Sequence, residues 1–312
     1  MVKKITNTAP KADLYQTITD KVLALLEGGK LPWHQPWAAG VDGGAIARPI
    51  RATGEAYNGI NILLLWSAAA ERGFVNPQWM TFKQAIEFGG AVRKGEKATM
   101  CVYANSFAKI EEDEQGQDEE RRIPFLKQYH VFNVEQIDGL PDRFYAANVP
   151  AAPRNTQDRD DAAEAFFAAT GADIRHGGNK AFHQFDGVTS FVQMPAFEAF
   201  DEAEAYYATL AHEMIHWTKT PKRLDREFGR KRFGDEGYAM EELVAEMGAA
   251  FLLATLGLSP MPRPEHAAYI QSWIRVLKND KKAIVSAASH SGRAADYLHS
   301  LQPVPQAVAE AA

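Results

Sequence analysis

The stretch EAEAYYATLAHEMIHW, residues 202–217, decides the fold of the second half of the chain, because it has an apolar stripe at helical spacing and contains HEMIH at 212–216. A helix turns once in about 3.6 residues, so His212 and His216 lie one above the other on one face with Glu213 beside them. Two imidazoles so placed can bind one metal ion, with the glutamate as general base. The spacing predicts a zinc-dependent hydrolase; the alternative is two helix histidines that bind no metal.

A third metal ligand is expected downstream, because catalytic zinc sites combine three protein ligands with one open position. It is not the histidine of the longer pattern H-E-x-x-H-x-x-G-x-x-H, since Lys219 and Lys222 stand at its glycine and final histidine positions. A carboxylate must then supply it. Residues 235–257, DEGYAMEELVAEMGAAFLLATLG, predict a second helix with Glu242 and Glu246 one turn apart.

The two acids of this second helix have different expected roles. Glu242 would bind the metal, and Glu246 would accept the N–H of a ligating imidazole, although the two roles remain interchangeable. The alternative is that Glu241, Glu242 and Glu246 form a solvated face. Glu213 would take a proton from water and pass it to a leaving amine. The expected ion is Zn²⁺, with Mn²⁺ as the alternative.

Other parts of the site are indicated only by residue type or by a short pattern. Side chains that could stabilise an oxyanion are Tyr238, His183, His266 and Tyr269. The segment 190–194 is expected to be an edge strand that binds an extended peptide through its backbone. Residues 219–232, KTPKRLDREFGRKR, are rich in Lys and Arg, which is typical of a solvated loop, a phosphate-binding patch or a surface that steers an acidic substrate.

Composition indicates a globular protein of two domains, with 312 residues of which 46% are hydrophobic. The segment NVPAAPRNTQDRDD, 148–161, reads as a linker, so we expect domains at 1–150 and 151–312. The single cysteine, Cys101, excludes an internal disulfide and a Cys-based zinc site. With no signal-peptide segment and no apolar run long enough for a membrane span, a cytoplasmic protein is expected.

The expected fold class is α+β. The first half combines helices with a β-hairpin, and in the second half short strands precede helices. The expected helices and strands are helices from Asp13 to Gly28 and at 61–72 and 82–88, a hairpin of 99–110 and 125–137 with a long acidic loop, a helix at 162–170, strands near 173–175, 181–185 and 190–194, and helices at 202–218, 238–256, 265–278 and 280–300.

Charge distribution favours DNA binding by the first half, although the whole chain has a net charge of −6. Seven acids lie in the decapeptide EEDEQGQDEE, 111–120, so the remainder of residues 1–150 is net positive. Binding of single-stranded DNA needs aromatic faces and cations. Candidate contacts are Lys30, Trp33, Trp37, Arg48, Arg51, Tyr57, Lys83, Arg93, Lys94 and Lys97, together with Trp79, Lys127 and Tyr129. The alternative for most of these aromatic side chains is the core.

Two sets of segments together resemble the ArdC-type antirestriction proteins of plasmids and related mobile elements. One set is similar to the family's single-stranded-DNA-binding domain, which it shares with some conjugation primases: DLYQTITDKVLALLEGGKLPWHQPW (13–37), YNGINILLLW (57–66), WMTFKQAIEFGGAVRKGEKAT (79–99) and YHVFNVEQIDGL (129–140). The other is similar to its zincin-like metallopeptidase domain: HEMIHWT (212–218), RLDREFG (223–229) and GDEGYAMEELVAEMGAAFLLA (234–254).

The resemblance implies binding of single-stranded DNA, protection of incoming DNA from host restriction, and a metal site at His212, His216 and a downstream glutamate. ELVAE, 242–246, is also similar to the ligand helix of ImmA-type peptidases, which favours Glu242. Ser190 departs from the family, where an acid is expected. Duplex DNA and a host restriction or other DNA-associated protein are further candidate partners. Two alternatives remain: a DNA-binding shield without enzyme activity, and a peptidase without a DNA role.

Overall fold

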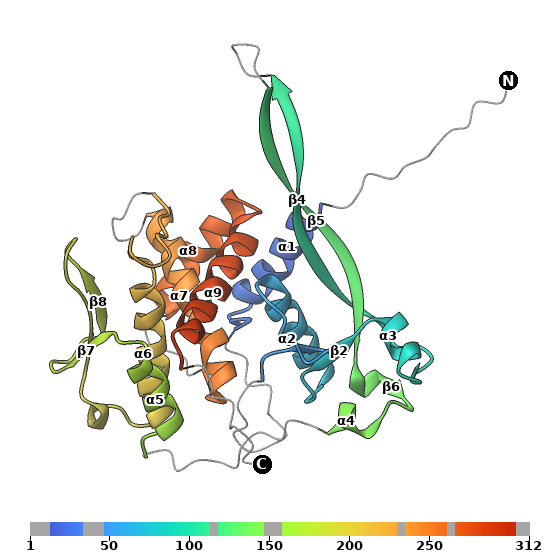
Figure 1. Cartoon of the computed structure of the whole chain (residues 1–312), viewed down its shortest axis with the longest axis horizontal. Helices are drawn as coiled ribbons and strands as arrows, with labels where there is room; N and C mark the ends of the chain where they lie inside the picture. Colours follow the sequence, from blue (N-terminus) through green and yellow to red (C-terminus); the bar gives the residue numbers. More distant parts are fainter. Residues whose placement is uncertain are drawn as a thin grey trace, which may run out of the picture.

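The computed structural model describes residues 13–33, 47–112, 118–146, 158–229, 235–260 and 266–303. Figure 1 shows a helical body with a small sheet at one side and, at the other, a lobe from which a long β-hairpin projects. Its elements are α1 Leu14–Glu27, β1 Ile50–Arg51, α2 Ile60–Arg72, β2 Gln78–Met80, α3 Phe82–Glu87, β3 Ala91–Val92, β4 Thr99–Glu112, β5 Asp118–Asn133, β6 Ile137–Asp138, α4 Asp142–Tyr145, α5 Asp161–Ala169, β7 Asp173–His176, β8 Phe182–Phe185, β9 Ser190–Met194, α6 Ala203–Trp217, α7 Glu236–Leu256, α8 His266–Asn279 and α9 Ala283–Ser300, with short 3₁₀ turns at Val134–Gln136 and Phe197–Ala199.

The first half has the expected elements. Helix α1 begins where the Asp13 carboxylate accepts the backbone N–H groups of Tyr15 and Gln16, and it ends before Gly28. A four-stranded sheet has the order β1-β2-β5-β4. The hairpin differs from the prediction, because its ladder continues into the acidic decapeptide as far as the pair Glu112 and Asp118. Only residues 113–117 of the predicted loop lie outside the described residues.

The second half has its strands before its main helices, as the sequence indicates. Strand β9 pairs in parallel with β7 on one side and antiparallel with β8 on the other. The prediction that 190–194 is an edge strand is therefore wrong, because both of its backbone edges are already paired and an extended peptide cannot add to it. The strands at the two edges of this sheet are β7 and β8.

Helix α7 is the centre of the helical body. It packs against α6, α8 and α9, which explains why its sequence is apolar on nearly every face. The Asp235 carboxylate accepts the backbone N–H of Tyr238 at its start, and Gly257 ends it in the left-handed conformation with φ of 67°. Both ends agree with the sequence prediction, and they fix where the acids of α7 lie along the helix.

A continuous apolar core joins the two halves of the chain. The rings of Trp33 and Trp273 meet edge to face with centroids 5.6 Å apart, and those of Trp66 and Phe251 do so at 5.7 Å. The predicted boundary near residue 150 lies outside the described residues and stays a prediction. Within the described ranges, no helix combines the length and apolarity that a membrane crossing requires.

Candidate metal centre

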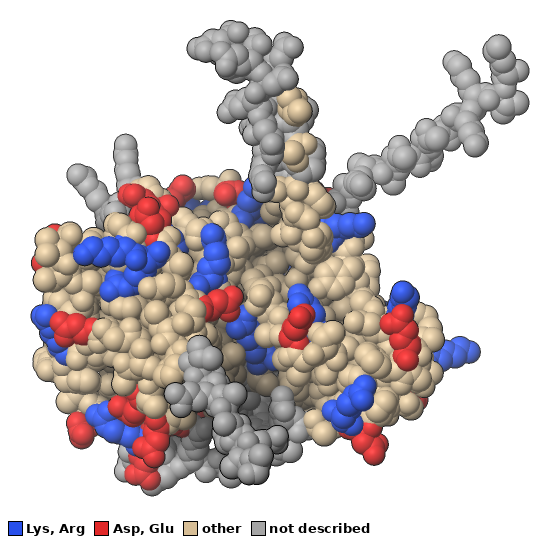
Figure 2. Space-filling model, viewed as in Figure 1, with Lys and Arg blue, Asp and Glu red and all other residues tan. Residues whose placement is uncertain are grey.

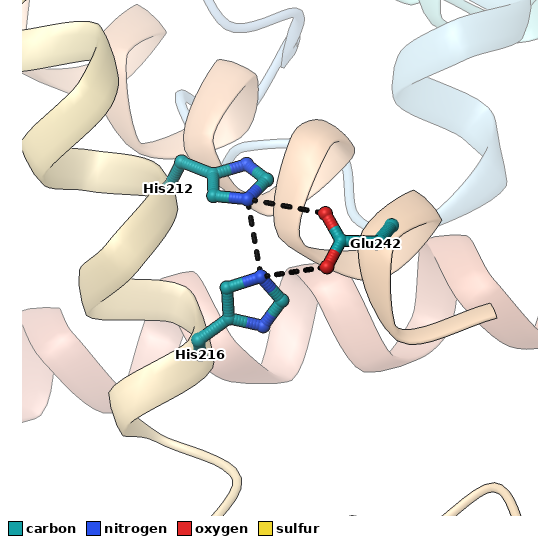
Figure 3. A group of neighbouring side chains, drawn as sticks. All are labelled: His212, His216 and Glu242. Atoms are coloured by element: carbon teal, nitrogen blue, oxygen red, sulfur yellow. Dashed lines mark hydrogen bonds and ion pairs between the residues drawn. The ribbon is translucent and has the colours of Figure 1, made fainter. Parts of the chain in front are cut away.

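Close contact between α6 and α7 brings the predicted ligands together. At the contact, Gly248 of α7 lies against Ile215 of α6, and a Cβ at position 248 would come within 3.0 Å of the isoleucine side chain. The missing side chain lets the two helices approach closely. His212 and His216, one turn apart on α6, then lie opposite Glu242 of α7 (Figure 3).

The three side chains converge on one point. The Nε2 atoms of His212 and His216 are 3.1 Å apart, and each lies 3.5 Å from one oxygen of the Glu242 carboxylate (Figure 3). The candidate ligand atoms all lie within 4.8 Å of one another. All three residues are buried, with exposed fractions of 2%, 7% and 6% respectively.

This donor set fits a divalent metal ion. Two imidazoles and one carboxylate are a combination found at catalytic zinc sites with three protein ligands. A neutral imidazole that carries its proton on Nδ1 has a lone pair on Nε2. With both rings in this form, two lone pairs face each other across 3.1 Å, an arrangement that a cation between them stabilises. The residues present therefore suit the ion that the HEMIH spacing predicts.

Two further carboxylates hold the imidazole rings in orientation. The Nδ1 atom of His212 lies 3.0 Å from a Glu246 oxygen, and that of His216 lies 2.9 Å from a Glu241 oxygen. An Nδ1–H that donates to a carboxylate leaves the Nε2 lone pair of the same ring available for a metal. Glu246 is thus close enough to His212 for the role that the sequence predicts, and Glu241 lies equally close to the other ring.

Arg226 in turn fixes the Glu241 carboxylate. Its guanidinium donates to both carboxylate oxygens at 2.8 Å, and also to the Ile215 carbonyl and the Thr218 hydroxyl. Only 1% of the Arg226 side chain is exposed. The view of 219–232 as a solvated or phosphate-binding segment is therefore wrong for Arg226, which lies in the core beneath the metal centre.

Electrostatics reinforce this arrangement. Burial raises the pKa of the Glu242 carboxyl, but His216 and His212 outweigh burial and hold it well below its usual value. Burial also raises the pKa of Glu241, but hydrogen bonds from Arg226 and His216 have the larger effect and lower this pKa to about 2. Burial lowers the pKa of His216, whereas Glu242 and Glu241 raise it to about 9. A metal must therefore displace a proton here, so its binding strengthens as pH rises.

A cavity of about 870 Å³ opens onto the candidate ligands. Glu213 lies in its wall beside them and is 6% exposed. Tyr238 and Tyr269 also line it, with their hydroxyl oxygens 3.1 Å apart. His183 lines it too, whereas the His266 side chain lies outside the described residues. Three of the four oxyanion candidates are thus at the cavity.

Ser190 occupies a position at which an acid is expected. Its hydroxyl accepts a hydrogen bond from Arg223 at 3.2 Å and lies 3.0 Å from the His183 Nε2. The Arg223 guanidinium also lies 3.4 Å from the ring centroid of Trp217 and donates to the Trp217 carbonyl. An acid at position 190 would face this arginine. With serine there, the partners of Arg223 among the described residues are uncharged.

The candidate DNA contacts divide by burial. Trp33, Tyr57 and Trp79 are 0%, 2% and 1% exposed, so their interpretation as stacking faces is wrong: they fill the core. Arg48 is 8% exposed and bonds to the Tyr57 carbonyl and Asp296, so it too faces inward. Trp37 lies outside the described residues. Among the candidate cations, those exposed in the structure are Lys30, Lys83, Arg93, Lys94, Lys97 and Lys127, and Arg51 is half-buried.

The surface cations have local partners in several cases. Arg93 pairs with Glu96 at 2.9 Å and Asp138 at 3.4 Å, and Lys83 lies 3.4 Å from Glu87. Figure 2 shows basic and acidic side chains interspersed over one face, some basic ones at the hollow between the helical body and the hairpin lobe. Any DNA contact on this face would therefore involve separate cations rather than a uniform basic field.

The fold and the metal centre define a protein with a zincin-like metallopeptidase domain. Comparison with protein families agrees, because residues 161–290 match a family described as zincin-like metallopeptidase. Residues 12–132 match the N-terminal domain of the anti-restriction factor ArdC. The chain belongs to the ArdC antirestriction family.

Solved structures of a relative show the same fold. The chain is 44% identical to metal-free ArdC from plasmid R388, with a TM-score of 0.77 over 93% of this chain and 97% of that one. Against the Mn(II)-bound structure of ArdC from R388 the identity is 42% and the TM-score 0.75, over 93% and 98% of the chains.

Of two further relatives, one is similar in length to this chain and the other is much longer. It is 39% identical over 295 residues to the uncharacterized protein y4eC of Sinorhizobium fredii, covering 93% of this chain and 92% of the relative. It is 35% identical over 308 residues to the DNA primase TraC of Escherichia coli, covering 92% of this chain. The chain spans only 27% of TraC.

Proposed function

We propose that the protein is a metal-dependent peptidase that also binds single-stranded DNA, and that it protects incoming DNA of a mobile element from restriction. The observation that carries the peptidase part is the convergence of His212, His216 and Glu242 beside Glu213 in one cavity. Its volume, about 870 Å³, lies within the range of about 300–1,000 Å³ that is common for ligand sites.

The chemistry follows from these positions. A zinc or manganese ion held by His212, His216 and Glu242 would polarise a peptide carbonyl and lower the pKa of a bound water molecule. Glu213 would accept the proton of the attacking water and deliver it to the leaving amine. Tyr238 suits the developing oxyanion as a donor, because burial and its neighbours Tyr269 and Glu242 raise its pKa and keep its hydroxyl protonated.

The metal itself is proposed as zinc or manganese. The His–His–Glu donor set is typical of zinc, whereas a relative, ArdC from plasmid R388, has a Mn(II)-bound structure. A cytoplasmic location suits the single cysteine, Cys101, which is a buried free thiol. The proposed peptidase substrate is a host restriction protein or another DNA-associated protein.

Support for the DNA part comes from the family and from the exposed lysines of the first half. Lys30, Lys83, Lys94 and Lys97 present ammonium groups to solvent, and cations of this kind bind phosphates in a salt-dependent way. The proposed partner is single-stranded DNA, and the alternative is duplex DNA. A binding assay with both forms would distinguish between them.

The experiment that tests the peptidase role replaces Glu213 with Gln in the full chain. Metal content, measured by elemental analysis, should persist, whereas cleavage of host DNA-associated proteins incubated with the purified protein should disappear. His212→Ala is the matched control and should lose the metal as well. Cleavage that persists in Glu213→Gln refutes the general-base role.

The same variant separates the alternative functions. If Glu213→Gln still protects incoming DNA fully and the wild type cleaves no protein, the non-enzymatic shield is favoured. If the wild type cleaves protein but fails to bind a labelled oligonucleotide at low salt, the DNA part of the proposal is refuted.

A further inference from the structure

A second cavity lies in the first half of the chain, at the base of the β4–β5 hairpin. Its volume is about 430 Å³, and its walls come from β1, the start of α3 and the two hairpin strands. The side chains that matter here are Arg51, Gln84, Tyr103 and Lys127, with Tyr57 and Tyr129 beneath them. Among the described residues that line it, two are cations and none is acidic.

Tyr103 presents an aromatic face to solvent at this cavity. It is 54% exposed, unlike the buried Trp33 and Trp79. Its hydroxyl accepts a hydrogen bond from the Asn105 amide at 2.7 Å, which holds the ring in place. An exposed and fixed ring is what base stacking requires.

Lys127 lies beside this ring. It is directly opposite Tyr103 in the antiparallel ladder, and side chains of directly opposed residues lie on the same face of a sheet. Lys127 is itself exposed. The side chains of Tyr103 and Lys127 therefore leave the sheet next to each other, and both line the cavity together with Arg51 of β1.

The floor of the cavity is uncharged. Burial raises the pKa of Tyr129 and that of the neighbouring Cys101 thiol to about 12, so both stay protonated at neutral pH. The Arg51 guanidinium, which pairs with Glu55 at 3.2 Å outside the cavity lining, lies 5.0 Å from the ring centroid of Tyr57, and Tyr57 is 2% exposed. An apolar aromatic floor under cations suits a ligand with a flat ring and an anionic group.

We infer that this cavity binds one unpaired nucleotide of a DNA single strand, with the base on Tyr103 and the adjacent phosphate at Lys127 and Arg51. The inference rests on the proposed DNA binding and names where it occurs. A paired base is already stacked between its neighbours, so the cavity selects a single strand over a duplex. The Gln84 Oε1 atom accepts the backbone N–H of Thr81 at 2.9 Å, so the amide nitrogen of Gln84 is the atom that can donate to a base edge.

The test measures binding of a fluorescein-labelled oligothymidylate to the full chain by fluorescence anisotropy. Tyr103→Ala should weaken binding about 5- to 150-fold, the usual loss for one stacked base, and Tyr103→Phe should restore it. Lys127→Gln should reduce the slope of log affinity against log salt by about 0.7, the contribution of one single-strand phosphate. Val188→Ala, at a side chain 82% exposed between β8 and β9, is the control and should bind as the wild type does.

A strand of the same length without bases separates stacking from misfolding. Tyr103→Ala and the wild type should bind this abasic strand equally, because neither can stack a base on it. If Tyr103→Ala binds oligothymidylate as tightly as the wild type, the inference is overturned while the proposed DNA binding stands. If the wild type binds neither strand, the DNA part of the proposed function fails with it.

Discussion

Replacing Arg226 with Met removes the cation that holds the Glu241 carboxylate against His216. The arginine side chain is 1% exposed and that of Glu241 is 11% exposed, so the carboxylate would lose its guanidinium partner away from water while it keeps its contact with His216. Breaking a buried ion pair by removing one member costs about 3–5 kcal/mol of the free energy of unfolding. Loss of a group that orients a ligating imidazole lowers metal affinity about 10- to 100-fold.

Urea unfolding and a metal titration of the same variant measure the two effects. Lys222→Met, at an exposed lysine of the same basic segment, is the control and should change neither quantity. The double variant Arg226→Met with Glu241→Leu should recover most of the stability, because no unpaired charge remains. Its metal affinity should be low, because the leucine at position 241 leaves His216 without the carboxylate that accepts its Nδ1–H.

The opposite result is a free energy of unfolding for Arg226→Met within about 0.5 kcal/mol of the wild-type value, the usual effect of a surface substitution, together with equal metal affinity. Such a result would mean that Glu241 finds water or another partner, and that the orientation of the His216 ring does not depend on it.

Two further predictions concern the helix contact and acid stability. Gly248→Val should lower the free energy of unfolding by about 1–3 kcal/mol and weaken metal binding. The reason is that a Cβ at position 248 would already come within 3.0 Å of the Ile215 side chain, and valine adds two methyl groups. An unchanged urea midpoint would contradict this. Burial, with Lys219 and His216, lowers the pKa of His183 from 6.5 to about 3, so the unfolded state binds more protons below pH 6.5 and stability falls as pH drops towards 3. In His183→Asn the free energy of unfolding should fall less steeply as pH drops through this range. The prediction fails if the free energy of unfolding has the same pH dependence in the variant and the wild type.

The helices of the metal centre could be predicted from the sequence because their signals are local. HEMIH lies on α6 as expected, and the predicted caps Asp235 and Gly257 set the ends of α7. Spacing along a helix fixes which residues share a face. The four-residue spacing of Glu242 and Glu246 therefore predicts from the sequence alone that the two acids lie one turn apart.

The role of Glu241 could not be predicted in the same way. Glu241 and Glu242 are neighbours that point about 100° apart on a helix, and only the position of α6 shows that both reach an imidazole. Arg226, the partner of Glu241, comes from a basic segment whose composition resembles a solvated loop. A buried arginine is recognised only from the tertiary contacts that surround it.

Long-range packing also decided which aromatic side chains face solvent. Trp33 and Tyr57 stand near cations in the sequence, and a core ring and a stacking ring have the same local pattern. Trp33 meets Trp273 from the other half of the chain, a contact that no short segment encodes. The central position of β9 similarly depends on pairing between strands, which short sequence patterns do not determine.

Anomalous diffraction from crystals of the protein soaked in zinc or manganese shows whether His212, His216 and Glu242 bind one ion together. We expect one peak, about 2.0–2.2 Å from the Nε2 atoms of both His212 and His216 and from a Glu242 oxygen. Glu246 should stay beside the Nδ1 of His212, from which one of its oxygens lies 3.0 Å away, and outside bonding distance of the ion. A peak bound by Glu246 in place of Glu242, or no peak between the two imidazoles, would contradict the account.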